Sequence, residues 1–563
     1  MSRAPLAVLI LGGYGVFGGR LAGLLADEEH LGLIVAGRSI EAASAFCATH
    51  QGKAHVAPMR FDRDGDVEAQ LREIGPGIIV DATGPFQSYG ADPYRVVRAA
   101  ILLGIDYLDL ADGSDFVEGV AAVDEAARAK GVFVLSGAST CPVLTVAVVR
   151  RLSQGMTRLD CVVGGIAPSP HAGVGLNVLR AVASYAGRPI RLIREGVPTQ
   201  GFGLTETERY TIAPPGRLPL ESRIFSLVDV PDLRLLPRLW PSLRSVWMGM
   251  GPTPALLHRI FIGLARLVRL RLLPGIASFA PLMHRVLDAL RFGRHRGGMF
   301  VAVEGVGPDG EGVTRSWHMI AEGDDGPFIP SMAAASIIRR CLDGRRPLPG
   351  ARDASGELEL CDYEALFARR AIFTGVREDG PAEHMKPLYR RLLGESFTAL
   401  PLPLREMHDI GPGLSAEGMA SVERGRGLLS RLVGLAFRLP PAGRDVPVSV
   451  RFEPKQGSEI WHRNFAGHRF SSFQSAGRGR AHRLLRERFG PFAFDLALVV
   501  ADERLDLVPR RWSFLGLPLP NALGPRCEAF EFAEEGKFHF HVEIGLPVVG
   551  LLVRYRGWLV PTR

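Results

Sequence analysis

The chain has 563 residues, of which 47% are hydrophobic and 22% charged, and its formal net charge is +8. This composition is ordinary for folded protein, and the length corresponds to about three or four domains that each bury a core. The six cysteines form no Cys-x-x-Cys pair, which argues against a zinc site or a disulfide framework and favours a reducing, cytoplasmic compartment. We expect no membrane-spanning helix. The basic residues are nearly all arginine, and because no nucleic-acid-binding motif accompanies them we expect no nucleic-acid partner.

A short apolar run, residues 6–11, leads directly into a glycine-rich turn. Gly13, Gly15 and Gly18 match the Gly-x-Gly-x-x-Gly pattern of a dinucleotide-binding βαβ unit. The first glycine permits a tight turn, the second lets the backbone approach a pyrophosphate, and the third lets the following helix pack closely. That helix, expected over 20–29, would offer its free N–H groups to the phosphates. The predicted phosphate-binding segment comprises Gly13, Tyr14, Gly15, Val16, Phe17 and Gly18.

A second match to the same pattern, at Gly305, Gly307 and Gly310, has a different context. Its Pro-Asp-Gly sequence is typical of a turn, and residues 313–320 have the pattern of a strand rather than a helix. We therefore expect residues 299–304 and 313–320 to form a hairpin.

The choice between NAD and NADP depends on the end of the second predicted strand, 31–36. An acidic residue there would bind the 2′-hydroxyl of NAD. The chain instead has Arg38 followed by Ser39. A guanidinium group suits a phosphate, so NADP(H) is the predicted cofactor, although an arginine in a surface loop is the alternative interpretation. Asp62, after a third strand at 56–61, is expected near the adenine.

The nicotinamide half of the cofactor is expected beside the loop that follows a fourth strand, 77–82. Ligands of doubly wound sheets bind beyond the carboxyl ends of the strands. The predicted contact residues are Thr83, Gly84, Pro85 and Phe86. Further helices at 93–103 and 116–130 alternate with strands at 104–110 and 131–136, which predicts a Rossmann domain over residues 1–150.

Four segments in this order resemble the NADP-binding domain of the saccharopine dehydrogenase (reductase)-like family. They are Gly-Gly-Tyr-Gly-Val-Phe-Gly at 12–18, Ala-Gly-Arg-Ser at 36–39, Asp-Ala-Thr-Gly-Pro-Phe at 81–86 and Gly-Ile-Asp-Tyr-Leu-Asp-Leu at 104–110. The resemblance covers residues 5–145 and implies an NADP(H)-linked oxidoreductase. It also implies a following substrate and dimerisation domain, although no arginine here can be assigned to the binding of an amino-acid substrate.

Residues 151–370 are predicted to form that α+β domain, with a strand at 159–166 and helices at 173–185 and 331–342. Within it, the segment from Asp232 to Arg296 has eleven arginines and only two acidic residues. Two basic amphipathic helices are predicted at 254–292, on either side of Pro274. These helices have three interpretations. They could pack on the domain or on a second subunit, or they could contact an anionic membrane at its inner face. They could also form an apolar lid over the substrate.

The C-terminal region, 385–563, is predicted to be mainly antiparallel β structure, after a linker at 375–383 and a short helix at 388–393. Alternation is clear in Phe-His-Phe-His-Val-Glu-Ile at 538–544, which favours a curved sheet or barrel. Segments 461–467, 471–472, 517–520 and 554–558 resemble a bacterial domain of unknown function of the DUF4166 type. His539 and His541 share one strand face, but no third ligand can be assigned, so no metal site is predicted.

The predicted fold class is therefore α/β: a Rossmann doubly wound sheet, an α+β domain and a mainly antiparallel β domain. The predicted function is NADP(H)-dependent oxidation or reduction of an apolar carbonyl or enoyl compound. The alternative is a non-catalytic protein that senses NADP and binds a lipid-like ligand. Tyr89, Cys141 and His171 lie on loops that could supply a proton donor, although each is better explained as a structural or merely adjacent residue.

Overall fold

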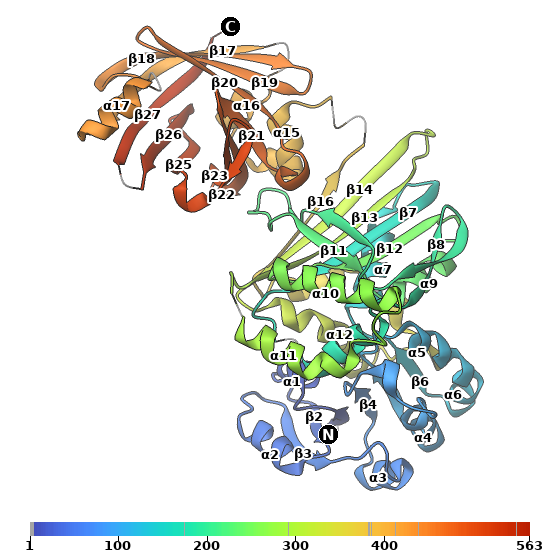
Figure 1. Ribbon diagram of the computed structural model, residues 1–563. Helices are drawn as coiled ribbons and strands as arrows, with labels where there is room; N and C mark the ends of the chain where they lie inside the picture. The colour runs from blue at the N-terminus through green and yellow to red at the C-terminus, as the bar shows by residue number, and fades with distance from the viewer. Residues whose placement is uncertain are drawn as a thin grey trace. The chain divides into compact units, whose positions relative to one another are not determined.

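The computed structural model describes residues 5–562 except 174, 291, 381–382, 384, 411–412, 437–438 and 548. The chain folds into two compact units, which are described separately below (Figure 1). The first unit comprises residues 1–208, 224–312 and 320–372. The second comprises residues 209–223, 313–319 and 373–563.

The N-terminal part of the first unit is built on a seven-stranded sheet in the order β15-β6-β5-β4-β1-β2-β3. Its strands are Leu6–Leu11 (β1), Leu31–Gly37 (β2), His55–Arg60 (β3), Ile78–Asp81 (β4), Asp106–Asp109 (β5), Phe133–Ser136 (β6) and Gly350–Asp353 (β15). The neighbouring strands pair in parallel. The order reverses between β1 and β4, so a crevice opens at the carboxyl ends of these two strands. The predicted doubly wound Rossmann sheet is confirmed.

Helices pack against this sheet. They are Val16–Leu24 (α1), Ile40–Ala48 (α2), Val67–Ile74 (α3), Arg95–Leu103 (α4), Ser114–Gly119 (α5), Asp124–Lys130 (α6) and Ile329–Leu342 (α12). α1 begins four residues before the predicted start at Arg20, because Gly18 and Gly19 lie inside its first turns and let it start close to the glycine loop. α12 returns from far along the chain to pack on α1, and its Ser331 hydroxyl donates to the Phe17 carbonyl at 3.0 Å.

A second seven-stranded sheet has the order β10-β11-β12-β7-β13-β14-β16. Its strands are Arg158–Ala167 (β7), Thr207–Tyr210 (β10), Arg223–Leu227 (β11), Ser245–Met250 (β12), Arg296–Val306 (β13), Gly312–Glu322 (β14) and Ile372–Glu378 (β16). β13 and β14 form the predicted hairpin, with the second glycine motif in its turn. The predicted start of the linker at residue 375 is wrong, because β16 continues to Glu378.

The remaining elements of the first unit surround this sheet. They are Thr145–Leu152 (α7), Leu176–Tyr185 (α8), Pro189–Arg194 (β8), Val197–Phe202 (β9), Asp232–Leu239 (α9), Ala255–Arg269 (α10), Ala280–Ala289 (α11) and Leu360–Phe367 (α13). α10 and α11 are the two helices predicted on either side of Pro274. The buried residues of α10 are His258, Ile262, Ala265 and Val268, whose spacing of three or four places them on one face.

The second unit carries parts of β10, β14 and β16 of the preceding sheet, and from residue 414 onward it forms a closed antiparallel barrel. Its strands are Leu414–Arg424 (β17), Gly443–Lys455 (β18), Ser458–Phe465 (β19), His468–Ala476 (β20), Leu485–Phe489 (β21), Phe492–Ala501 (β22), Arg504–Phe514 (β23), Leu517–Leu519 (β24), Arg526–Glu534 (β25), Lys537–Leu546 (β26) and Gly550–Thr562 (β27). The pairing of β22 with β23 closes the ring, and β24 extends β23. Helices Leu388–Leu393 (α15), Leu402–His408 (α16) and Leu428–Ala436 (α17) accompany it. The predicted barrel is confirmed.

Candidate functional site

The glycine turn lies between β1 and α1 at the crevice of the first sheet. Gly12 adopts a φ of +71°, which a residue with a side chain rarely takes, and the N–H of Gly15 donates to the Gly12 carbonyl at 2.8 Å. Gly15 and Val16 are exposed at the start of α1. A Cβ on Gly18 would come within 2.8 Å of the Gly13 Cα, so only glycine fits there. The turn therefore leaves the first N–H groups of α1 open to an anion.

The ends of β1 and β2 lie side by side, because Leu11 pairs with Ala36 in parallel register. The Ser39 N–H donates to the Tyr14 hydroxyl at 3.2 Å, which fixes the glycine turn to the end of β2. The Ser39 hydroxyl also accepts from the Ala42 N–H at 3.1 Å and so caps α2. Arg38 is exposed, and within the described part of the chain it has no ion-pair partner. Its guanidinium is thus available to a phosphate.

The loop after β4 is held from both sides. The buried Asp81 carboxylate accepts from the Thr83 N–H at 3.0 Å and from the Thr83 hydroxyl at 2.6 Å. The side-chain amide of Asn177, near the start of α8, donates to the carbonyls of Thr83 and Gly84, each at 3.1 Å. Phe86 is only 6% exposed and packs on Phe116 with ring centroids 5.0 Å apart. Phe86 therefore anchors the end of the loop in the core, and Asn177 holds the carbonyls of Thr83 and Gly84.

Asp62 lies after β3, as predicted, and its carboxylate accepts from the Asp64 N–H at 3.1 Å. The next residue, Arg63, places its guanidinium carbon 3.2 Å from the centroid of the Tyr89 ring. The segment after β3 and the segment after β4 are thereby connected through side chains.

Tyr89 is the sequence candidate that lies nearest the crevice. Its hydroxyl is 2.6 Å from the Thr83 hydroxyl and 3.3 Å from both oxygens of Asp81. Burial, together with the negative charge of Asp81, raises the pKa of Tyr89 far above its usual range. Tyr89 is therefore neutral at all ordinary pH values, with its hydroxyl held in a hydrogen-bond network.

The other two sequence candidates are engaged elsewhere. Cys141 is buried in the turn before α7, its Sγ is 3.6 Å from the Thr145 hydroxyl, and burial raises the pKa of its thiol, so the thiolate is disfavoured. His171 stacks on His295 at 3.7 Å, and its Nε2 is 3.0 Å from the Gly293 carbonyl oxygen.

A carboxyl group that the sequence analysis did not identify lies beside the segment that follows β4. Asp112 follows β5, and the Gln87 amide donates to its Oδ1 at 3.1 Å. Burial raises the pKa of Asp112, and the nearby Asp229 raises it further. Asp229, which accepts from the Ser114 hydroxyl at 2.6 Å, also has a pKa raised by burial. The signal that could have identified Asp112 is its position just beyond the carboxyl end of a central strand.

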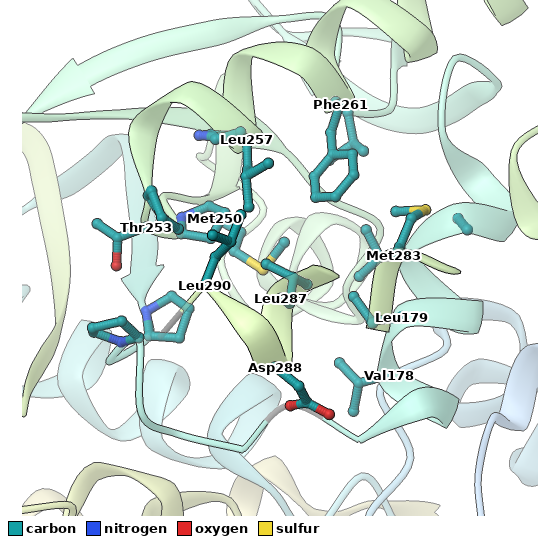
Figure 2. A pocket seen from close by; sticks show the side chains of 18 of the residues that line it. Val178, Leu179, Met250, Thr253, Leu257, Phe261, Met283, Leu287, Asp288 and Leu290 are labelled. Atoms are coloured by element: carbon teal, nitrogen blue, oxygen red, sulfur yellow. The ribbon is translucent and has the colours of Figure 1, made fainter. Parts of the chain in front are cut away.

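An apolar cavity of about 80 Å³ lies beneath α10 and α11 (Figure 2). Three helices contribute to its walls, with Leu179 from α8, Phe261 from α10 and Met283 from α11. Ser169, Thr253 and Asp288 are polar or charged lining residues. The other apolar lining residues are Pro168, Pro170, Val178, Val182, Ala183, Leu204, Met250, Pro252, Pro254, Leu257, Ile276, Leu287 and Leu290. His258 is buried here, and its Nε2 is 2.8 Å from the Ser226 hydroxyl. Such a lining favours an apolar ligand over water.

The predicted candidates of the second unit form separate contacts. Trp461 is buried, and the Arg463 guanidinium lies 4.8 Å from its ring centroid and pairs with Glu487 at 3.2 Å. His539 stacks on Phe532 and His541 on Phe530. Within the described ranges, no group of three or more His, Cys, Asp or Glu side chains is arranged to hold a metal ion.

The first unit contains a doubly wound Rossmann sheet, with the glycine turn between its first strand and its first helix. Residues 400–559 match the family described as "Domain of unknown function (DUF4166)". No curated protein matches the chain. No helix in the described part of the chain is long and apolar enough to cross a membrane.

Several solved structures of NAD(P)-dependent oxidoreductases resemble part of the chain. Saccharopine dehydrogenase (L-Glu forming) from Saccharomyces cerevisiae is 13% identical with a TM-score of 0.48, covering 66% of this chain and 100% of that one. GenD2 from gentamicin A biosynthesis, in complex with NAD, is 13% identical with a TM-score of 0.32, covering 66% and 97%. Biliverdin reductase from Synechocystis, in complex with biliverdin and NADP⁺, is 12% identical with a TM-score of 0.29, covering 64% and 94%.

Proposed function

We propose that the protein is an NADP(H)-dependent oxidoreductase that acts on an apolar carbonyl or enoyl substrate. The observation that carries this proposal is the position of α8. Its Asn177 holds the carbonyls of the loop after β4, while its next residues, Val178 and Leu179, line the apolar cavity. One helix thus borders both the expected nicotinamide position and a compartment for an apolar chain.

The glycine turn would hold the pyrophosphate, and Arg38 with Ser39 would hold the 2′-phosphate of the adenosine half. Thr83, Gly84 and Pro85 would border the nicotinamide, which supplies or accepts the hydride when bound. Arg38→Ala should therefore lose affinity for NADPH far more than for NADH, measured by fluorescence titration. Equal losses would show that Arg38 does not contact the 2′-phosphate.

We assign the proton donor to Asp112. A carboxyl group whose pKa is raised by burial keeps its proton nearer to neutral pH, as a general acid must. The Gln87 amide orients it beside the loop after β4. Tyr89 and Thr83 then position that loop through Asp81.

The assay is mass spectrometry of the small molecules that the purified protein carries, followed by NADPH consumption with any compound found. A bound nicotinamide dinucleotide together with an apolar carbonyl or enoyl compound that is turned over would support the proposal. Turnover of strongly polar substrates only would contradict the assignment of the cavity.

A second function, NADP sensing coupled to binding of a lipid-like ligand, is favoured by one observation. Tyr89, Cys141 and His171 are all held in contacts that oppose a catalytic role. Stoichiometric NADPH binding without turnover on any carbonyl or enoyl compound would support this function. Consumption of NADPH with a defined product would exclude it.

We also propose that the outer face of α10 and α11 contacts an anionic membrane. Large apolar side chains exposed in this segment are Leu256, Ile260, Leu267, Leu270, Leu272, Phe279 and Leu282. Exposed arginines alternate with them at Arg259, Arg266, Arg269, Arg271 and Arg285. Apolar side chains among cationic ones suit the headgroup zone of anionic lipid.

Sedimentation with anionic vesicles tests this contact. The measurement is made at low salt, because the electrostatic attraction is strongest there. Leu256→Asp with Leu270→Asp should weaken vesicle binding by at least tenfold without changing NADPH affinity. No binding by the unmodified protein would refute membrane contact. A homodimer in solution whose interface covers this face would instead support packing of α10 and α11 on a second subunit.

A further inference from the structure

A pocket of about 520 Å³ lies on the wall of the barrel in the second unit. Its floor is formed by β21, β22 and β23, and its rim by the turns around Arg478, Gly490 and Gly516. The volume is within the range of sites that hold small organic molecules. Nothing in the Rossmann unit takes part in it, because every lining residue belongs to the second unit.

The lining of this pocket is strongly cationic. Its five arginines are Arg478, Arg480, Arg486, Arg488 and Arg511. The one acidic residue that lines it is Asp495, which is buried. Both Asp495 oxygens are occupied by Arg486, with Nε to Oδ1 at 2.6 Å and Nη2 to Oδ2 at 3.0 Å. The single carboxylate is therefore neutralised by one arginine alone.

The four other arginines have no such compensation. Across the residues that the structure covers, none of Arg478, Arg480, Arg488 and Arg511 forms an ion pair with a carboxylate. Like charges gathered in a concave site repel one another and focus a positive potential there. Binding of an anion with more than one negative oxygen relieves that repulsion, and guanidinium groups match phosphate oxygens in pairs.

Exposed apolar side chains lie on the turn that borders the pocket. The turn between β23 and β24 carries Leu515, which lines the pocket and is 71% exposed, and Leu517, which is 69% exposed. Phe514 next to them is 38% exposed. The indole of Trp512 also lines the pocket, with its N–H bound to the Pro520 carbonyl at 3.0 Å. A water-soluble anion would leave these apolar side chains exposed to water, whereas an amphiphile would cover them with its own apolar part.

We propose that this pocket binds the phosphate headgroup of an anionic phospholipid, with the β23–β24 turn contacting the adjoining acyl region. Phosphate is the chemistry that the arginines recognise. The exposed leucines at the same mouth select the lipid over a free phosphate, because their transfer from water to the membrane interface adds to the electrostatic attraction.

The test uses the full-length protein saturated with NADPH, so that the glycine turn is blocked. Its two probes are inorganic pyrophosphate measured by calorimetry and vesicles with or without phosphatidylglycerol measured by sedimentation. Arg478→Gln, Arg480→Gln and Arg511→Gln together should weaken pyrophosphate binding and anionic-vesicle binding by at least tenfold. The matched control replaces Arg451, Arg469 and Arg526, three exposed arginines of the same barrel, by glutamine. It removes the same charge and should change binding by less than about threefold.

Leu515→Asp with Leu517→Asp separates the two sources of phosphate. This variant should lose vesicle binding and keep pyrophosphate affinity, because the arginines remain. Because the face of α10 and α11 is also proposed to contact vesicles, the vesicle measurements compare all these variants in a protein that already carries Leu256→Asp and Leu270→Asp. In that protein, vesicle binding that survives Leu515→Asp with Leu517→Asp, or that falls equally in the pocket variant and the control, would overturn the lipid assignment. NADPH affinity, which belongs to the first unit, should stay unchanged in every variant, so this outcome is independent of the proposed oxidoreductase function.

Discussion

Gly15→Ala separates cofactor binding from folding. Gly15 has a φ of −79° and a ψ of 179°, which alanine adopts without strain. A Cβ at this position would lie 3.0 Å from the Gly12 carbonyl oxygen, and the next atom, the Gly12 carbonyl carbon, would be 3.9 Å away. The added methyl group is therefore tight against one atom and otherwise projects to the open side of the turn, where a pyrophosphate would approach.

The expected magnitudes follow from this geometry. One tight contact costs about 1 kcal/mol, and the lower chain entropy of the unfolded alanine variant offsets part of it, so Tm should change by a few degrees at most. NADPH affinity should fall at least tenfold, which corresponds to about 1.4 kcal/mol. Fluorescence titration with NADPH and a thermal melt measure the two effects on the same sample.

Two other glycines of α1 provide the controls. Gly18→Ala would place a Cβ 2.8 Å from the Gly13 Cα, a backbone atom that cannot move aside, so binding and Tm should fall together. At Gly23 the nearest atom, Phe328 Cε1, is 4.0 Å away, so alanine should raise stability by about 0.5–1 kcal/mol with NADPH binding unchanged. The reasoning fails if Gly15→Ala binds NADPH as the unmodified protein does, or unfolds as readily as Gly18→Ala.

Three further predictions concern the compartment for the substrate. Asp112→Asn should abolish NADPH turnover while leaving NADPH binding intact. The unmodified enzyme should lose reductase activity as the pH rises through the raised pKa of Asp112. If Asp112→Asn also lost NADPH binding, Asp112 would have a structural role instead. Burial lowers the pKa of His258 to about 4, below the value of about 6.5 that it has in the unfolded chain. The free energy of unfolding should therefore decrease as the pH falls from 7 towards 4, because the unfolded chain binds the proton first. At pH 5 the decrease should be about 2 kcal/mol. Hydrogen exchange of α10 at pH 7 and pH 5 measures this loss, and His258→Gln should remove most of the difference. Ala183→Leu fills part of the cavity and should raise KM for an apolar substrate without affecting NADPH affinity; an unchanged KM would remove the cavity from the substrate path.

Much of the first unit could be predicted because its signals are local. Consecutive apolar residues mark a strand that is buried on both faces, and β1, β2 and β4 have that pattern. Turn chemistry also distinguished the first glycine motif from the second, which lies in the β13–β14 hairpin. Boundaries were less well predicted, and α1 begins inside the glycine motif because its glycines can be helical.

The second unit shows where periodicity is insufficient. β19 was not predicted, because its inward-facing residues include Glu459 and Arg463 beside Trp461, so no alternation of apolar and polar residues is visible. These polar groups are tolerated inside the barrel because each finds a partner, such as Glu487 for Arg463. Which partner a buried charge finds depends on strands far apart in the sequence.

The sequence by itself determined the Rossmann sheet, the position of the glycine turn after its first strand and the position of Arg38 at the end of its second strand, because each depends on residues within one βα unit. Tertiary structure alone decided that α8 borders both the nicotinamide loop and an apolar cavity, and that Asp112 lies beside Gln87. It also gathered Arg478, Arg488 and Arg511 into one pocket. These juxtapositions join residues from separate strands and helices, and the contacts that fix them form only when the sheets pack.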